Sequence, residues 1–191
     1  MRRAMWMLAV AVVSLRAETV DLKAHLEKTR GMFLASIAGL SEEQWTFKPA
    51  PERWSVAECA EHITASEDFG FGLISGKVMQ GPAPAEKKFD DAQVVKMVTD
   101  RNFKAEAPPP LRPVGRWKTS KDVKRQFGDL RDRTAAFARD NADQLRSHGA
   151  EHPAFQQPVD AYQWLLFLSG HTERHTMQIQ EVKAHANFPK H

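Results

Sequence analysis

The chain has very little of what crosslinking and redox chemistry need. Cys59 is the only cysteine among 191 residues. A single thiol excludes an intrachain disulfide, a CxxC zinc site and a dithiol redox centre. A chain of this length is nevertheless large enough to bury a core without crosslinks, so the simplest organisation is one domain.

The N-terminus has no apolar run long enough for a comfortable membrane span. The run at residues 4–15, AMWMLAVAVVSL, follows a basic MRR start and precedes the small Ala17. A short apolar run between a basic start and a small residue is typical of a secretory signal peptide over residues 1–17. We therefore predict cleavage after Ala17, a domain over residues 18–191, a periplasmic or extracellular location and no stable membrane insertion. An uncleaved N-terminal anchor is the alternative.

The rest of the chain has no excess charge of either sign. The 27 basic and 24 acidic residues differ by three, and the N-terminal segment accounts for this difference through Arg2, Arg3 and Arg16. A domain with balanced charge has no electrostatic signature of nucleic-acid binding. The composition therefore predicts no nucleic-acid partner.

Sustained alternation of apolar and polar residues, which would indicate half-buried strands, is also absent. Helical spacing of apolar residues appears in four long segments, at about residues 19–38, 55–75, 120–145 and 159–184. A single helical turn is expected to open at Ser41. One further short helix is expected between the proline-containing stretches at 81–85 and 107–113. Four amphipathic helices with a long middle crossover predict an all-α four-helix bundle.

The second long segment has a clear start signal. Ser55 and Glu58 form the S-x-x-E pattern of a capping box, and Trp54 with Cys59 can form a hydrophobic staple around it. This capping duty explains Glu58 without a catalytic function.

Two histidines stand four residues apart in the last helical segment. His171 and His175 should therefore lie on one helix face, one turn apart. They could be hydrogen-bonded core residues, exposed polar residues or two metal ligands. If the second and fourth long helices are neighbours, His62 can face them across the core, and three neutral imidazoles can share one divalent cation.

The HTERH sequence does not form a zincin motif, because Thr172 stands where HExxH needs its glutamate. Glu173 should turn towards the opposite face and be solvated rather than act as a general base. Arg174 and Gln178 project closer to the histidine face. Either could hold a polar group of the substrate or support a ligand, and a surface position is the alternative for Arg174.

The other histidines are expected to be exposed or locally hydrogen-bonded. They are His25, His148, His152, His185 and His191.

The run LSEEQWTFKPAPERWSVAECAEHITASED, followed far downstream by SGHTERHTMQIQEVK, resembles the DinB-like superfamily of metal-binding four-helix bundles. The shared pattern is a Trp-Ser helix start leading to a histidine, then H-x-x-x-H-x-x-Q near the C-terminus. The resemblance covers about Leu22 to Val182. It implies an up-down-down-up bundle in which His62, His171 and His175 hold a divalent metal, zinc or nickel being the expected ions. Similar bundles often dimerise, so a homodimer is also expected.

Members of this superfamily include metal-dependent hydrolases and thiol-dependent transferases and isomerases that use bacillithiol or mycothiol. An open three-histidine metal can lower the pKa of a bound water or of a bound thiol. Reduced thiol cofactors belong mainly to the cytosol, so the predicted export favours hydrolysis. We therefore expect a metal-dependent hydrolase with a small-molecule substrate. A thiol S-transferase and a non-catalytic metal- or ligand-binding bundle are the alternatives.

Overall fold

The computed structural model describes residues 19–102 and 105–190, so the predicted signal peptide lies outside the described residues. Four long helices form the bundle: α1 (Leu22–Ser36), α3 (Val56–Gly76), α5 (Ser120–Asp140) and α6 (Ala161–Lys183). Each corresponds to one of the four segments predicted from helical spacing.

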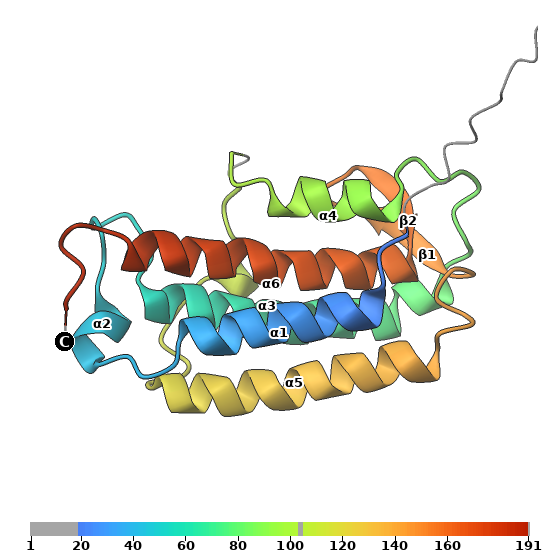
Figure 1. The fold of residues 1–191 in the computed structure, drawn as a ribbon. Helices are drawn as coiled ribbons and strands as arrows, with labels where there is room; N and C mark the ends of the chain where they lie inside the picture. The colour runs from blue at the N-terminus through green and yellow to red at the C-terminus, as the bar shows by residue number, and fades with distance from the viewer. Residues whose placement is uncertain (1–18, 103–104, 191) are drawn as a thin grey trace, which may run out of the picture.

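The four helices have the up-down-down-up order (Figure 1). α1 and α6 run in one direction, and α3 and α5 run in the other. α6 packs against α1 and α3, and α5 packs against the same two helices from the other side. α3 and α6, which carry the candidate ligands, are therefore neighbours, as the three-histidine hypothesis required.

Short elements occupy the connections. α2 (Glu42–Thr46) follows a capping box between Ser41 and Gln44, as predicted. The long crossover contains the 3₁₀ turn η1 (Val78–Gln80), the short helix α4 (Asp91–Thr99) and a second 3₁₀ turn, η2 (Pro109–Leu111). α4 packs on the outer side of α6 (Figure 1).

A small antiparallel hairpin, β1 (Gly149–His152) and β2 (Gln157–Asp160), precedes α6 and was not predicted. Its strands have four residues each, too few for a visible alternation. The chain comes very close to itself here: a Cβ added at Gly149 would lie 2.6 Å from the Val159 carbonyl oxygen. α5 ends at Asp140, earlier than the predicted boundary, with Asn141 as its C-cap, and residues 141–147 form turns that lead to the hairpin.

The bundle interior has two apolar clusters with a buried polar layer between them. One cluster surrounds Leu26, Ile74 and Leu165, and the other surrounds Phe33, Ile63 and Phe127. Each long helix contributes polar residues to the layer at the point where it passes from one cluster to the other. These buried residues are Thr29, Glu67, Arg131, Thr134, Ser169, Thr172 and Thr176.

None of the helices in the described ranges combines the length and the apolar character that a bilayer crossing requires.

Candidate metal centre

α3 begins as its sequence predicts, and this start places His62 inside the bundle. The Ser55 hydroxyl accepts from the Glu58 amide at 3.1 Å, and the Glu58 carboxylate accepts from the Ser55 amide at 2.7 Å. These two reciprocal bonds confirm the capping interpretation, and Glu58 also pairs with Lys48 at 3.0 Å. Less than two turns later, His62 is 3% exposed.

His62, His171 and His175 come together between α3 and α6. One ring nitrogen from each lies within 4.8 Å of those of the other two. The Nε2 atoms of His62 and His171 are 3.3 Å apart, and the His175 ring centroid lies 4.5 Å from that of His62. Among the residues that the structure describes, this is the one cluster of three or more His, Cys, Asp or Glu able to share a metal ion.

Two of the rings are held through the nitrogen that faces away from the cluster. The His62 Nδ1–H donates to the Leu111 carbonyl oxygen at 2.9 Å, and the His175 Nδ1–H donates to Gln178 Oε1 at 2.8 Å. A proton fixed on Nδ1 leaves the lone pair of a neutral imidazole on Nε2. Both rings therefore have their lone pairs available to the cluster, and oxygen acceptors of this kind commonly orient metal-binding histidines.

The surroundings keep these rings neutral. Burial lowers the pKa of His62, although the hydrogen bond to the Leu111 carbonyl opposes the shift. Burial also holds the pKa values of His171 and His175 well below the ordinary value, and the neighbouring histidines add to the effect. Neutral imidazole is the form that binds metal, so no proton needs to be displaced near pH 7.

The donor set fits a divalent cation. Because the His62 lone pair is turned towards His171 at 3.3 Å, either a proton on His171 Nε2 or a cation between the rings is needed to offset lone-pair repulsion. Three neutral nitrogens are a common ligand set for an open zinc site, which leaves at least one coordination position for water or substrate.

Aromatic side chains flank the cluster. The Trp54 ring lies 4.9 Å from that of His62, and the Phe167 ring stacks at 6.2 Å from that of His171. His171 keeps part of its surface accessible to solvent. Aromatic rings therefore flank the cluster on two sides, and His171 is the least buried of the three histidines.

Gln178, Arg174 and Glu173, the other polar residues in or next to the HTERH motif, each have a different partner. Gln178 supports His175, as described above. Arg174 donates to the Asp100 carbonyl oxygen at the end of α4. Glu173 points to α1, as its helical position predicted, but it is not solvated: its side chain is 15% exposed. His25 and Lys28 on α1 lower its pKa to about 2.

Two histidines expected to be exposed or locally bonded are buried instead. His25 contacts the Ser169 hydroxyl across the α1–α6 interface at 2.8 Å. His152 accepts locally from the Ala154 amide, yet it is buried against the rings of Trp164 and Phe167 at 4.2 and 4.1 Å. Burial lowers its pKa to about 4. The hairpin, which sequence periodicity did not reveal, brings His152 into the core.

The sequence matches a known protein family over most of the bundle. The family model of the DinB superfamily matches residues 25–179, a range that includes all three clustered histidines and most of the bundle. The chain belongs to the DinB superfamily.

One relative by sequence and one solved structure illustrate the similarity. YuaE from Bacillus subtilis (strain 168), an uncharacterized protein, is 28% identical over 149 residues, which are 77% of this chain and 88% of YuaE. The structure of YfiT from Bacillus subtilis matches with a TM-score of 0.60 at 14% identity, covering 88% of this chain and 87% of that one. YfiT is described as a probable metal-dependent hydrolase with an unusual four-helix bundle topology. At this identity the similarity shows a shared fold.

Sequence reasoning did not find the Leu111 carbonyl. It is a backbone group in the long crossover, 49 residues from His62, and no side-chain pattern marks it. The proline-rich stretch indicated only a break between helices.

Proposed function

We propose that this protein is a metal-dependent hydrolase in which His62, His171 and His175 hold a divalent cation, zinc or nickel. The convergence of three ring nitrogens within 4.8 Å is the observation that carries the proposal. The Nδ1 hydrogen bonds of His62 and His175 support it, because they leave the Nε2 lone pair of each ring free for a cation. The description of YfiT as a probable metal-dependent hydrolase favours hydrolysis over other metal chemistry.

A divalent cation bound there supplies Lewis acidity, which polarises a carbonyl or phosphoryl group and lowers the pKa of bound water towards about 7. The protein residues around the cluster hold the ligand rings in position and exclude water. Gln178 keeps the His175 ring in place, and Trp54 excludes water from one side of His62. Since His171 is the least buried of the three histidines, we expect substrate to approach from its side.

Arginines from three elements favour an anionic group on the substrate. Arg101 donates two bonds to Glu181, at 3.0 and 2.9 Å, and Arg53 lies 3.8 Å from the same carboxylate. Arg174 adds a third guanidinium, and both Arg174 and Arg101 help to lower the pKa of His175. Arg101 and Arg53 pair with the single Glu181 carboxylate, and Arg174 acts on it electrostatically. Three cations set against this one carboxylate favour attraction of a carboxylate or phosphate group towards the histidines.

The test is a hydrolysis screen of the purified protein against chromogenic carboxylic esters, amides and phosphomonoesters, each with zinc, with nickel and with chelator. The proposal expects turnover that chelator abolishes and that His62→Ala removes. Arg101→Ala should raise KM for an anionic substrate more than for its neutral analogue. Turnover that is equal with and without metal, or none with any class, would contradict the hydrolase proposal.

Thiol transfer at the same site is the second candidate. It is favoured by the arginine rim, which suits the carboxylates of a small thiol cofactor, and by the absence of a carboxylate from the metal-capable cluster among the described residues. Metal-dependent conjugation of a small thiol to an electrophilic aryl halide, without ester or phosphoester hydrolysis, would favour transfer over hydrolysis.

Export after cleavage at Ala17 and assembly as a homodimer also belong to this proposal. The basic and apolar start of the sequence supports export. Its resemblance to bundles that dimerise supports the dimer.

A further inference from the structure

A buried carboxylate stands next to the first proposed ligand and takes no part in the histidine cluster. Glu61 directly precedes His62 on α3 and is 4% exposed. An ionised carboxylate is costly to bury unless hydrogen bonds replace the water that it loses. The partners of Glu61 therefore indicate what it does.

All of these partners come from the segment at residues 109–116, which we call the strap. Oε1 accepts from the Val114 amide at 2.7 Å and from Arg116 Nη1 at 2.6 Å. Oε2 accepts from the Gly115 amide at 2.7 Å and from the Arg116 amide at 3.2 Å. A carboxylate has about four acceptor sites, so Glu61 is fully occupied and is available neither as a metal ligand nor as a base.

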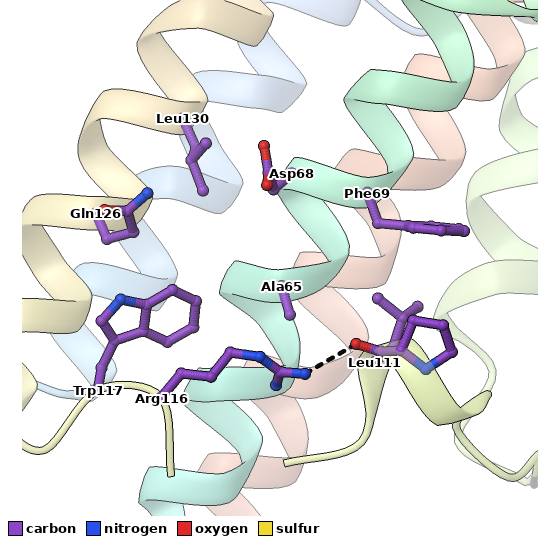
Figure 2. Close-up of a pocket in the computed structure, with 9 residues that line it drawn as sticks. Ala65, Asp68, Phe69, Leu111, Arg116, Trp117, Gln126 and Leu130 are labelled. Atoms are coloured by element: carbon purple, nitrogen blue, oxygen red, sulfur yellow. Dashed lines mark hydrogen bonds between the residues drawn. The ribbon is translucent and has the colours of Figure 1, made fainter. Parts of the chain in front are cut away.

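The strap conformation depends on this anion. Three successive amides point at one carboxylate, and Gly115 has a φ of +78°, which L-residues with side chains rarely adopt. Arg116 also donates to the carbonyl oxygens of Arg112 and Pro110, at 3.0 and 2.9 Å. Figure 2 shows its guanidinium reaching along the strap, with its bond to the Pro110 carbonyl oxygen dashed. Without the Glu61 carboxylate, the three amides would lose their shared acceptor.

The same strap supplies the acceptor for His62. Its Leu111 carbonyl oxygen receives the His62 Nδ1–H, whereas the Leu111 side chain lines a separate pocket of about 270 Å³ between α3 and α5 (Figure 2). Glu61 and His62 are thus connected in two ways. They are adjacent in the helix backbone, and both form hydrogen bonds with the strap, Glu61 with its amides and His62 with the Leu111 carbonyl oxygen.

We propose that Glu61 is a positioning residue for the metal site: its carboxylate closes the strap, and the closed strap fixes the ring orientation and tautomer of His62 through the Leu111 carbonyl. The expected effect of Glu61 on metal affinity rests on the proposed metal centre. The expected effect of Glu61 on the orientation and tautomer of the His62 ring does not require metal. Loss of a hydrogen-bond partner behind a metal-binding histidine typically costs 10- to 100-fold in metal affinity.

The main variant is Glu61→Gln in the full chain. The amide keeps the size of the side chain but turns an NH₂ group towards donors, so the strap should open and the zinc Kd should rise 10- to 100-fold. Nitrogen-15 NMR of the metal-free protein at a pH where the rings are neutral should show His62 changing from one Nδ1–H tautomer to a mixture. If the Glu61 carboxylate only stabilised the fold, its replacement would leave the His62 tautomer unchanged.

A second variant loosens the strap without altering the carboxylate. Gly115→Val places a β-branched residue at a φ of +78°, with the nearest atom, Lys118 Nζ, 3.6 Å from the new Cβ, so backbone strain is the main effect. It should reproduce the Kd increase and the tautomer change. It also decides the question if Glu61→Gln does not fold.

Asp91→Asn is the matched control. Asp91 is also a buried carboxylate, bonded to Arg146 at 3.0 and 2.6 Å, but it lies where α4 packs near the start of α6. It should destabilise the protein and leave the zinc Kd within about twofold. An unchanged Kd and tautomer in Glu61→Gln would overturn the proposal, and so would an equal loss of affinity in Asp91→Asn. If wild-type protein binds no metal, the proposed function fails, and the His62 tautomer in the same variants still decides the function of Glu61.

Discussion

Replacing Arg131 by methionine tests the buried polar layer that divides the bundle core. Arg131 is 1% exposed and donates to Glu67 Oε2 at 2.9 Å, to the Leu26 carbonyl and to the hydroxyls of Thr29 and Thr172. Glu67 is 0% exposed, so the Arg131→Met variant leaves a carboxylate without a cation inside the bundle. Breaking a buried pair in this way costs about 3–5 kcal/mol.

The double replacement Arg131→Met with Glu67→Leu should recover most of this loss. Arg131 Nε and Glu67 Oε1 have no hydrogen-bond partner within the described residues, so the pair itself is incompletely satisfied. The hydroxyls of Thr29 and Thr172 already contact the carbonyls of Leu26 and Leu168 in their own helices. A well-packed apolar pair is therefore expected to come within about 1–2 kcal/mol of wild type or to exceed it.

Urea unfolding of the metal-free proteins, followed by circular dichroism, measures these differences without a contribution from metal binding. For a domain of this size, the single variant should also lower Tm by roughly 6–20 °C. Glu67→Leu alone completes the comparison. A cost below about 1 kcal/mol in Arg131→Met would refute this prediction, and so would a loss in the double variant equal to the sum of the losses in Arg131→Met and Glu67→Leu.

Three further predictions concern other parts of the chain. Burial lowers the pKa of His152 to about 4. The unfolded chain therefore binds more protons at this residue between pH 4 and the ordinary His pKa of about 6.5, and His152 alone should remove about 2–3 kcal/mol of stability as the pH falls through this window. His152→Phe should remove that part of the pH dependence, and an unchanged slope in urea titrations at several pH values would refute it. Glu58→Gln keeps much of the capping box, so it should cost less than about 1 kcal/mol and leave metal content unaltered; a large loss of turnover at full stability would show that Glu58 is catalytic. N-terminal sequencing of protein from an exporting host should find Glu18 first, whereas a cytosolic product that begins at Met1 would contradict the export prediction.

The sequence was sufficient for the bundle because its signals are local and repeated. Helical spacing, two capping boxes and proline-rich breaks each fix structure over a few turns, and they agree with one another. The histidine cluster required one long-range assumption, that the helix of His62 neighbours that of His171 and His175. Adjacent α3 and α6 satisfied this assumption.

The features that sequence reasoning missed depend on tertiary contacts without a local pattern. The hairpin has strands of four residues, and it is the reason that His152 lies in the aromatic core. His25 is buried because Ser169 and Glu173 come from a helix far along the chain. Glu61 looks like any helical glutamate until the strap amides are seen around it. None of these features produces a periodic pattern of apolar residues: the strands are too short, the acceptors are backbone groups, and the contacting residues are far apart in sequence.

The three-histidine metal site is tested most directly by the metal content of wild type and of three single variants, His62→Ala, His171→Ala and His175→Ala. His148→Ala and His185→Ala are the controls. Each protein is offered zinc and nickel separately, dialysed and analysed for bound ion, and its Tm is measured with and without chelator. Wild type and both controls should bind one ion per chain, and chelator should lower their Tm. Each of the three variants should bind the ion much more weakly, and the protein with all three histidines replaced should not respond to chelator. Full stoichiometric binding in any of the three would contradict its assignment as a ligand, and wild-type protein that binds neither ion would show that these are core histidines and not a metal site.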